Sequence, residues 1–192
     1  MQFCKPIDII INHDWDKTIL ATQKLLSLKS AGSLSDYGKS EHYDLKSLGT
    51  ISQHKTSESW FRVASPVINK TMPWIDDLLN TMAELKPDEG AISYLHGAGA
   101  GHIDLPHLQT SLNYIFKNSD LAAHTWVEYD NIKEVYPSQL NTAWLLDTQK
   151  LHGIENNGHR WTLTIHFNSD YDVVCKWFEE HPGLIFETKD KV

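Results

Sequence analysis

Apolar residues in the first half of the chain predict helices with a short strand before them. Residues 14–30 place their apolar side chains mostly on one helical face. Residues 71–87 are predicted to form a second helix, because Pro73 suits a first helical turn and Pro87 lies just past the end. The apolar run at residues 7–13 precedes the first helix and is predicted to be a strand.

A long polar stretch separates the two predicted helices. Residues 31–57 are rich in Ser, Gly, Lys and His and show little periodicity, so they are predicted to form a loop. Loops of this length are usually functional or disordered, which makes this one the candidate for a lid that faces a substrate. A further strand is predicted directly after it, at residues 59–67.

After residue 88 the pattern changes to short segments rich in Trp, Tyr, Thr and Ile, as strands are. Five such segments are separated by turn-like residues: GAISYLHG, LQTSLNYIF, AAHTWVEY, NTAWLLDT and RWTLTIHF. A short closing helix is predicted at residues 170–182. Its apolar face is expected to hold Val173, Val174, Trp177 and Phe178.

Helices followed by a run of strands predict a mainly β fold, a sandwich or barrel buttressed by helices. The length of 192 residues fits a single domain. Its parts would be a buttress of helices, strands and polar loop at residues 1–88, a β core at residues 90–168, and the closing helix. No internal repeat or second domain is visible in the sequence.

Composition narrows the classes of function. The net charge of −8 argues against general nucleic-acid binding, which needs a basic footprint. No apolar run approaches the roughly 18 residues that span a membrane, and the N-terminus lacks a signal-peptide layout, so we expect a cytoplasmic protein without a membrane partner. Cys4 and Cys175 are expected to be reduced, buried thiols rather than a disulfide. The sequence does not indicate the oligomeric state.

A histidine and an aspartate stand two positions apart in front of one predicted strand. His102 and Asp104 follow the glycine-rich run HGAGAG. Residues two apart in an extended chain point the same way, so both side chains can reach one metal ion. The best candidate for a third ligand is His152, between the strands TAWLLDT and RWTLTIHF. Two histidines and one carboxylate form the facial triad of non-haem Fe(II) oxygenases, which leaves coordination positions open.

The strand RWTLTIHF begins with Arg160 and has two different faces. One face is polar and the other is apolar, as expected of a strand that lines a polar pocket and packs outward against helices. The polar face holds Arg160, Thr162, Thr164 and His166. A guanidinium can bind a carboxylate through two parallel hydrogen bonds. Arg160 is therefore suited to the far carboxylate of a dicarboxylic 2-oxo acid that chelates iron at its other end.

The ordered set of HID at residues 102–104, His152 and Arg160 resembles the 2-oxoglutarate/Fe(II)-dependent oxygenases of the double-stranded β-helix fold. The similarity is greatest to the branch of aspartyl/asparaginyl β-hydroxylases and small proline hydroxylases, and it covers roughly residues 90–168. It implies a jelly-roll, cupin-like barrel. It also implies an enzyme that binds Fe(II) and 2-oxoglutarate and uses dioxygen to hydroxylate an amino acid, a small metabolite or a side chain of a peptide or protein.

The chain departs from better-known members of that family in its basic residues. Those members often carry further cations that help to hold the co-substrate. The permanent cations between His102 and His152 are only Lys117, Lys133 and Lys150. Contacts to the co-substrate are instead expected from Tyr94, Ser111, Asn113 or His124. Tyr94, Ser111 and Asn113 also suit ordinary strand positions, and His124 also suits a hydrogen-bonded pocket or surface histidine.

The same residues also have simpler interpretations that do not involve an oxygenase. His102 and Asp104 also suit a turn that closes a glycine-rich loop, and Arg160 suits a surface ion pair with Glu155 at a barrel rim. A non-catalytic, cupin-like binding or structural module would keep the barrel without the chemistry. The HExxH, GxSxG and P-loop patterns of other enzyme classes are absent from the sequence.

Overall fold

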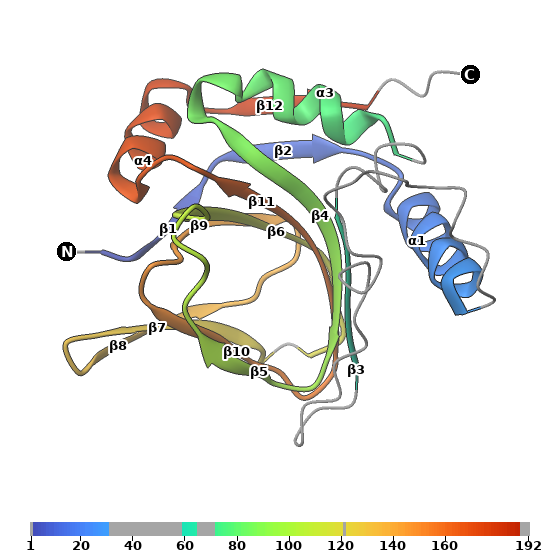
Figure 1. Cartoon of the computed structure of the whole chain (residues 1–192), viewed down its shortest axis with the longest axis horizontal. Coiled ribbons are helices and arrows are strands. Elements are labelled where there is room, and N and C mark those ends of the chain that lie inside the picture. Colours follow the sequence, from blue (N-terminus) through green and yellow to red (C-terminus); the bar gives the residue numbers. More distant parts are fainter. Residues whose placement is uncertain (1, 31–58, 65–71, 121, 189–192) are drawn as a thin grey trace.

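The computed structural model describes residues 2–30, 59–64, 72–120 and 122–188 (Figure 1). The predicted polar loop at residues 31–57 lies outside the described residues, as does the end of the predicted strand at residues 59–67. None of the helices in the described part is both long and apolar enough to cross a membrane.

Two antiparallel sheets face each other and form a barrel (Figure 1). The strand order is β1-β9-β6-β11-β4-β3 in the larger sheet and β5-β10-β7-β8 in the smaller sheet. The larger sheet contains β1 (Cys4–Ile7), β3 (Ser59–Ala64), β4 (Pro87–His96), β6 (Thr110–Asn118), β9 (Thr142–Asp147) and β11 (His159–Phe167). The smaller sheet contains β5 (Gly99–His102), β7 (His124–Tyr129), β8 (Ile132–Pro137) and β10 (Leu151–Glu155).

The eight consecutive strands β4 to β11 pair as one long antiparallel hairpin that is wound into the barrel. β4 pairs with β11, β5 with β10, β6 with β9, and β7 with β8. These nested pairs alternate between the two sheets, and the pairings of β6 with β11 and of β7 with β10 join successive turns of the winding. This topology is a double-stranded β-helix, or jelly roll, and it confirms the predicted fold class.

The sequence predicted five strands in this region, and the structure adds β5, β8 and β10. β5 reads GAGH and β10 reads LHGIE, so neither has the composition typical of a strand. β8 follows β7 through a tight turn at Asp130 and Asn131, whose φ angles are 49° and 62°. Positive φ at both central residues is the mark of a type I′ hairpin turn, and this Asp-Asn pair was the sequence signal for β8.

Helices and a short parallel sheet cover the outer face of the larger sheet (Figure 1). The helices are α1 (Trp15–Ser30), α3 (Trp74–Thr81), the 3₁₀ turn η2 (Ala83–Leu85) and α4 (Tyr171–Glu180), and the short sheet pairs β2 (Ile9–Asn12) with β12 (Leu184–Glu187). The core between these layers includes Ile75 and Leu78 of α3 and Leu163 and Phe167 of β11, all fully buried. The predicted helical buttress is confirmed.

Three predicted elements differ in detail from the structure. The run at residues 7–13 belongs to two strands, β1 and β2. The helix predicted at residues 71–87 ends at Thr81, because the chain tightens into η2 and then turns at Lys86, where φ is 52°. On α4, Val174 and Phe178 are buried as expected, whereas Val173 is 53% exposed.

Both cysteines are free, with Cys4 buried and Cys175 partly buried.

The alternation along β11 separates two environments. Trp161, Leu163, Ile165 and Phe167 pack into the core under the helices. Arg160 and His166 lie on the other face and reach residues outside the larger sheet, since Arg160 contacts Thr125 of β7 and His166 contacts Asp104. The predicted polar face therefore points into the barrel.

Phe167→Ala tests the core between the larger sheet and the helices. Phe167 is fully buried, so its truncation leaves a cavity and should lower the free energy of unfolding by about 3–5 kcal/mol. Val173→Ala on the exposed side of α4 is the control and should change it by less than about 0.5 kcal/mol. Urea titration followed by circular dichroism measures both, and equal effects would contradict this packing.

Candidate metal centre

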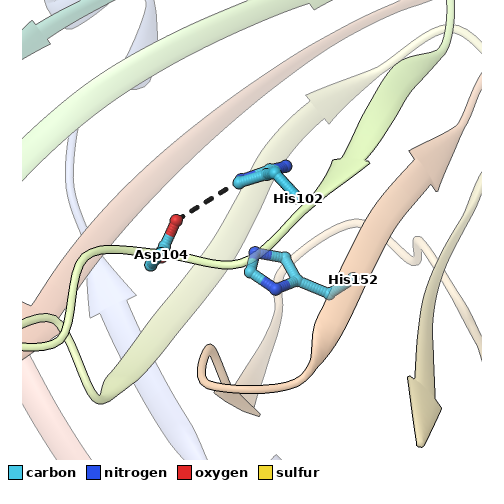
Figure 2. Close-up of side chains that lie close together, drawn as sticks. All are labelled: His102, Asp104 and His152. Atoms are coloured by element: carbon cyan, nitrogen blue, oxygen red, sulfur yellow. Dashed lines mark ion pairs between the residues drawn. The ribbon is translucent and has the colours of Figure 1, made fainter.

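Three potential metal ligands meet at one end of the smaller sheet (Figure 2). His102 is the last residue of β5, Asp104 follows two positions later, and His152 is the second residue of β10. β5 and β10 are paired so that His102 lies directly opposite His152, and their ring centroids are 4.4 Å apart. The potential ligand atoms of the three residues all lie within 4.8 Å of one another. Ligands at about 2.0–2.2 Å from one ion are at most about 4.4 Å apart, so the arrangement is close to that of a metal site.

His152 is buried and its ring is oriented by the backbone. Its Nδ1 lies 2.9 Å from the carbonyl oxygen of Lys150, so the proton is assigned to Nδ1 and Nε2 is left to bind a metal. Burial lowers the pKa of His152, and the neighbouring His102 lowers it further, against the effect of the Lys150 carbonyl. The imidazole is therefore neutral at neutral pH, which is the form that coordinates metals.

Asp104 is held as a carboxylate by the histidines around it. Burial alone would raise its pKa, but the hydrogen bonds from His102 and His166, together with the electrostatic effect of His166, outweigh this effect. The pKa of Asp104 therefore lies well below its usual range. Its Oδ1 is 3.4 Å from His102 Nε2, and its backbone N–H donates to the carbonyl of Thr148.

A tryptophan packs directly behind His102 and His152, on the outer face of the smaller sheet. Trp126 of β7 lies against Gly101 and Gly153, which are the chain neighbours of His102 and His152. A Cβ atom at either glycine would come within 2.6 Å of the indole ring. The glycines thus let the ring cover the backbone that carries both imidazoles. The ammonium of Lys133 lies 4.6 Å from the centre of the indole.

Arg160 is a buried cation inside the same barrel. Only 4% of the residue is exposed, and Nη1 donates to Ser138 Oγ at 2.8 Å and, more weakly, to Thr125 Oγ1 at 3.4 Å. Burial lowers the pKa of Arg160 to about 10, so the guanidinium stays charged at neutral pH. Within the described residues its hydrogen-bond partners are hydroxyl groups and no carboxylate forms an ion pair with it.

The alternative of a surface ion pair between Arg160 and Glu155 does not hold. Glu155 pairs instead with His124 at 3.3 Å and with Lys133 at 3.0 Å, on the outer side of the smaller sheet. A buried charge is costly unless something compensates it. The guanidinium is therefore suited to an anionic ligand that enters the barrel.

The other residues predicted to contact the co-substrate lie on both faces of the sheets, and Ser111 and Asn113 lie on the inner face. Ser111 and Asn113 of β6 pair with the inward residues His166 and Thr164 of β11. The Asn113 amide donates to Ser111 Oγ at 2.8 Å, and Thr164 Oγ1 donates to Asn113 Oδ1 at 3.1 Å. These polar side chains line the inner wall of the larger sheet.

Tyr94 and His124 lie on outer faces instead. Tyr94 is opposite Trp161 in the register of β4 and β11, and its ring packs 5.1 Å from the indole of Trp161. His124 points to Glu155, whereas its neighbour Thr125 points inward to Arg160. Sequence analysis did not single out Thr125 or Ser138; the period of two along β7 was the signal that could have identified Thr125.

Comparison with known proteins identifies the barrel. No protein-family model and no curated protein matches the chain. A prolyl hydroxylase from Trichoplax adhaerens, solved with a peptide fragment of hypoxia inducible factor, superposes with a TM-score of 0.52 at 10% identity, over 89% of this chain and 86% of its own. A prolyl-4-hydroxylase from Pseudomonas putida gives a TM-score of 0.49 at 9% identity, over 88% and 94% of the two chains. A 2OG-Fe(II) oxygenase from Burkholderia pseudomallei gives 0.47 at 10% identity, over 58% and 71%.

At such low identity, the likeness concerns the fold. The structural neighbours include 2OG-Fe(II) oxygenases, and the chain shares the barrel fold of the Trichoplax prolyl hydroxylase. The candidate triad is an independent observation, because it comes from the positions of the chain's own side chains.

Gly153→Ala tests how Trp126 supports the histidine ligands. The new methyl group would overlap the indole, so either Trp126 or β10 must move. We expect a loss of about 1–3 kcal/mol in the free energy of unfolding together with weaker binding of Mn(II), measured by chemical denaturation and calorimetric titration.

Gly90→Ala is the matched control. A Cβ atom there would also come to 2.6 Å from a neighbour, but that neighbour is the Ile75 side chain in the core under the helices. This variant should lose stability and keep its affinity for Mn(II). Wild-type affinity in Gly153→Ala would show that the indole does not support the ligands.

Proposed function

We propose that this protein is a 2-oxoglutarate- and Fe(II)-dependent dioxygenase that hydroxylates an amino acid, a small metabolite or a side chain of a peptide or protein. One observation carries the proposal. A buried arginine with only hydroxyl partners among the described residues lies inside the same barrel that gathers two histidines and an aspartate. A metal centre and a separate anion site are the two things that binding of a chelating dicarboxylate requires.

The donor set fits Fe(II). Two imidazoles and one carboxylate, His102, Asp104 and His152, are the ligand types of the non-haem Fe(II) oxygenases, in which further coordination positions are open. When bound, Fe(II) supplies the oxidative chemistry, in which dioxygen is reduced, 2-oxoglutarate becomes succinate and carbon dioxide, and one oxygen atom enters a substrate C–H bond. The His102 side chain is 58% exposed, so a substrate can approach this end of the barrel from solvent.

Arg160 is the proposed partner of the far carboxylate of 2-oxoglutarate. Ser138 and Thr125 hold one nitrogen of the guanidinium, and a guanidinium has five N–H donors in all, so others are available for a carboxylate. Arg160 shares the inner face of β11 with His166, which contacts the metal ligand Asp104. The polar wall between the two ends of β11 is formed by Thr162 and Thr164 with the neighbouring Ser111 and Asn113.

The chain itself supports catalysis in three further ways. The backbone carbonyl of Lys150 keeps His152 in the tautomer that can bind a metal. The histidines around Asp104 keep its carboxyl group ionised. Burial of Arg160 strengthens its attraction for a carboxylate, because charges interact more strongly away from water.

Anaerobic addition of Fe(II) and then of 2-oxoglutarate tests the metal site. The wild type should bind one Fe(II) per chain and develop the weak visible charge-transfer band of an iron-bound 2-oxo acid. His152→Ala should lose most of the bound iron, because a buried ligand is removed. His124→Ala, a histidine on the outer face of the smaller sheet, should behave as the wild type. A non-catalytic binding module would show no band, and iron-loaded His152→Ala would rule out the assigned triad.

Arg160→Ala tests the co-substrate site separately from the metal. Loss of one partner of a buried charge pair costs roughly 2–5 kcal/mol, so the affinity for 2-oxoglutarate should fall by about thirty-fold or more. Arg160→Lys should recover only part of that loss, since lysine keeps the charge but lacks the planar guanidinium that forms two parallel hydrogen bonds with a carboxylate. Binding of Mn(II) should stay nearly unchanged in both variants. Calorimetric titration of 2-oxoglutarate into the Mn(II)-loaded proteins measures these affinities.

Lys133→Ala is the control for loss of a positive charge, because Lys133 lies on the outer face beside Trp126. It should bind 2-oxoglutarate as the wild type does. Equal affinities in the wild type and both Arg160 variants would remove Arg160 from the site, and with it the main argument for a dicarboxylate.

A further inference from the structure

A buried histidine and a buried glutamate lie behind the metal ligand Asp104. His166 is on the inner face of β11 and Glu89 is on the inner face of β4, directly opposite one another in the register of the two strands. They are only 8% and 9% exposed. Acidic residues are rarely buried to this degree unless they have a partner, so the contacts of Glu89 and of the neighbouring His166 are informative.

Asp104, His166 and Glu89 contact one another in that order. His166 Nε2 lies 3.4 Å from Asp104 Oδ2, and His166 Nδ1 lies 3.3 Å from Glu89 Oε1. Each ring nitrogen thus faces a carboxylate oxygen, and an imidazolium can donate to both. Glu89 holds the ring from the side away from the metal site, which directs Nε2 at Asp104.

The two oxygens of Asp104 consequently have different neighbours. Oδ1 lies 3.4 Å from the other ligand, His102, whereas Oδ2 is turned to His166. His166 is not itself among the residues whose donor atoms gather at the candidate metal site. A carboxylate whose second oxygen is engaged in this way presents one oxygen to a metal ion.

Asp104 is also the ligand with the least support from secondary structure. His102 and His152 stand on paired strands, but Asp104 follows the end of β5 and lies in no strand or helix. Its backbone N–H is held by the Thr148 carbonyl. His166 and Glu89 add a side-chain contact from the larger sheet, so both the backbone and the carboxylate of Asp104 are held.

We propose that His166, oriented by Glu89, is a positioning residue that holds Asp104 as a one-oxygen ligand. The proposal rests on the proposed metal site. By keeping Oδ2 away from the ion, His166 preserves an open coordination position that a two-oxygen aspartate would fill. Partners of this kind, one step removed from the metal, typically change metal affinity by about 10–100-fold when they are mutated.

Three variants test the proposal. His166→Phe fills the volume of the ring without a donor, His166→Gln keeps a donor, and Glu89→Gln keeps the volume while weakening the hold on the ring. The matched control is His96→Phe, the same substitution at the far end of β4, on the face opposite to that of Glu89. Circular dichroism and thermal unfolding of the metal-free proteins establish that each variant is folded.

Calorimetric titration with Mn(II) is the first measurement. His166→Phe should bind Mn(II) about 10–100-fold more weakly than the wild type, His166→Gln should recover part of the loss, and His96→Phe should match the wild type. Glu89→Gln should show a smaller loss in the same direction. Partial recovery by His166→Gln distinguishes a positioning contact from a general loss of packing.

Counting metal-bound water is the second measurement, by the broadening of the Mn(II) electron paramagnetic resonance lines in ¹⁷O-enriched water. His166→Phe should hold one water fewer than the wild type, because Asp104 is free to bind through both oxygens. A merely structural role for His166 would leave this number unchanged in the protein that still binds metal.

The outcomes separate the two proposals. A wild type that binds no Mn(II) would overturn the proposed metal site, and the positioning role with it. A wild type that binds Mn(II), with unchanged affinity and water count in every His166 and Glu89 variant, would overturn the positioning role alone. If His166→Phe does not fold, His166→Gln and Glu89→Gln decide: weakened binding supports the role and wild-type binding in both overturns it.

Discussion

The register of β5 against β10 is the constraint on which the candidate site depends. It places His102 opposite His152, and a slip of one residue would turn one imidazole to the outer face of the sheet. Yet β5 is a four-residue, glycine-rich strand, so little in its own sequence favours an extended conformation. Its position follows from the nested pairing of the eight barrel strands and from the contact between Gly101 and Trp126. The candidate metal ligands are thus positioned by the topology of the whole barrel.

Sequence patterns recovered the parts of this fold that have a strong period or composition. The alternation along β11 correctly separated an apolar face under the helices from a polar face inside the barrel, and α1 and α4 were located closely. β5 and β10 were missed because glycine and polar residues give no strand signal, although these two strands bear the two histidines of the candidate metal site. Their conformation comes from hydrogen bonds to neighbouring strands, which are contacts between distant parts of the chain.

In the candidate site, too, some features follow from local sequence patterns and others only from contacts between distant residues. His102, Asp104 and His152 were grouped from their types and order, and the structure brings them together. The choice between neighbours on β7 could not be made without the register: His124 faces outward, while Thr125 reaches Arg160. The contact between His166 and Asp104 joins β11 to the segment that follows β5, so no local pattern indicates it. That Arg160 has hydroxyl partners and not Glu155 likewise follows only from packing.

The two walls of the barrel differ in what lies behind them. The larger sheet, with Arg160 and His166 on its inner side, is backed by a helical core. The smaller sheet bears the two candidate histidine ligands, and on its outer side Leu151 and Val135 are exposed beside Trp126. Residues in contact with bulk water are therefore only one strand's thickness from the ligands. A substitution that moves Trp126 on this outer surface would therefore shift the candidate ligands without altering any group on the inner face of the barrel.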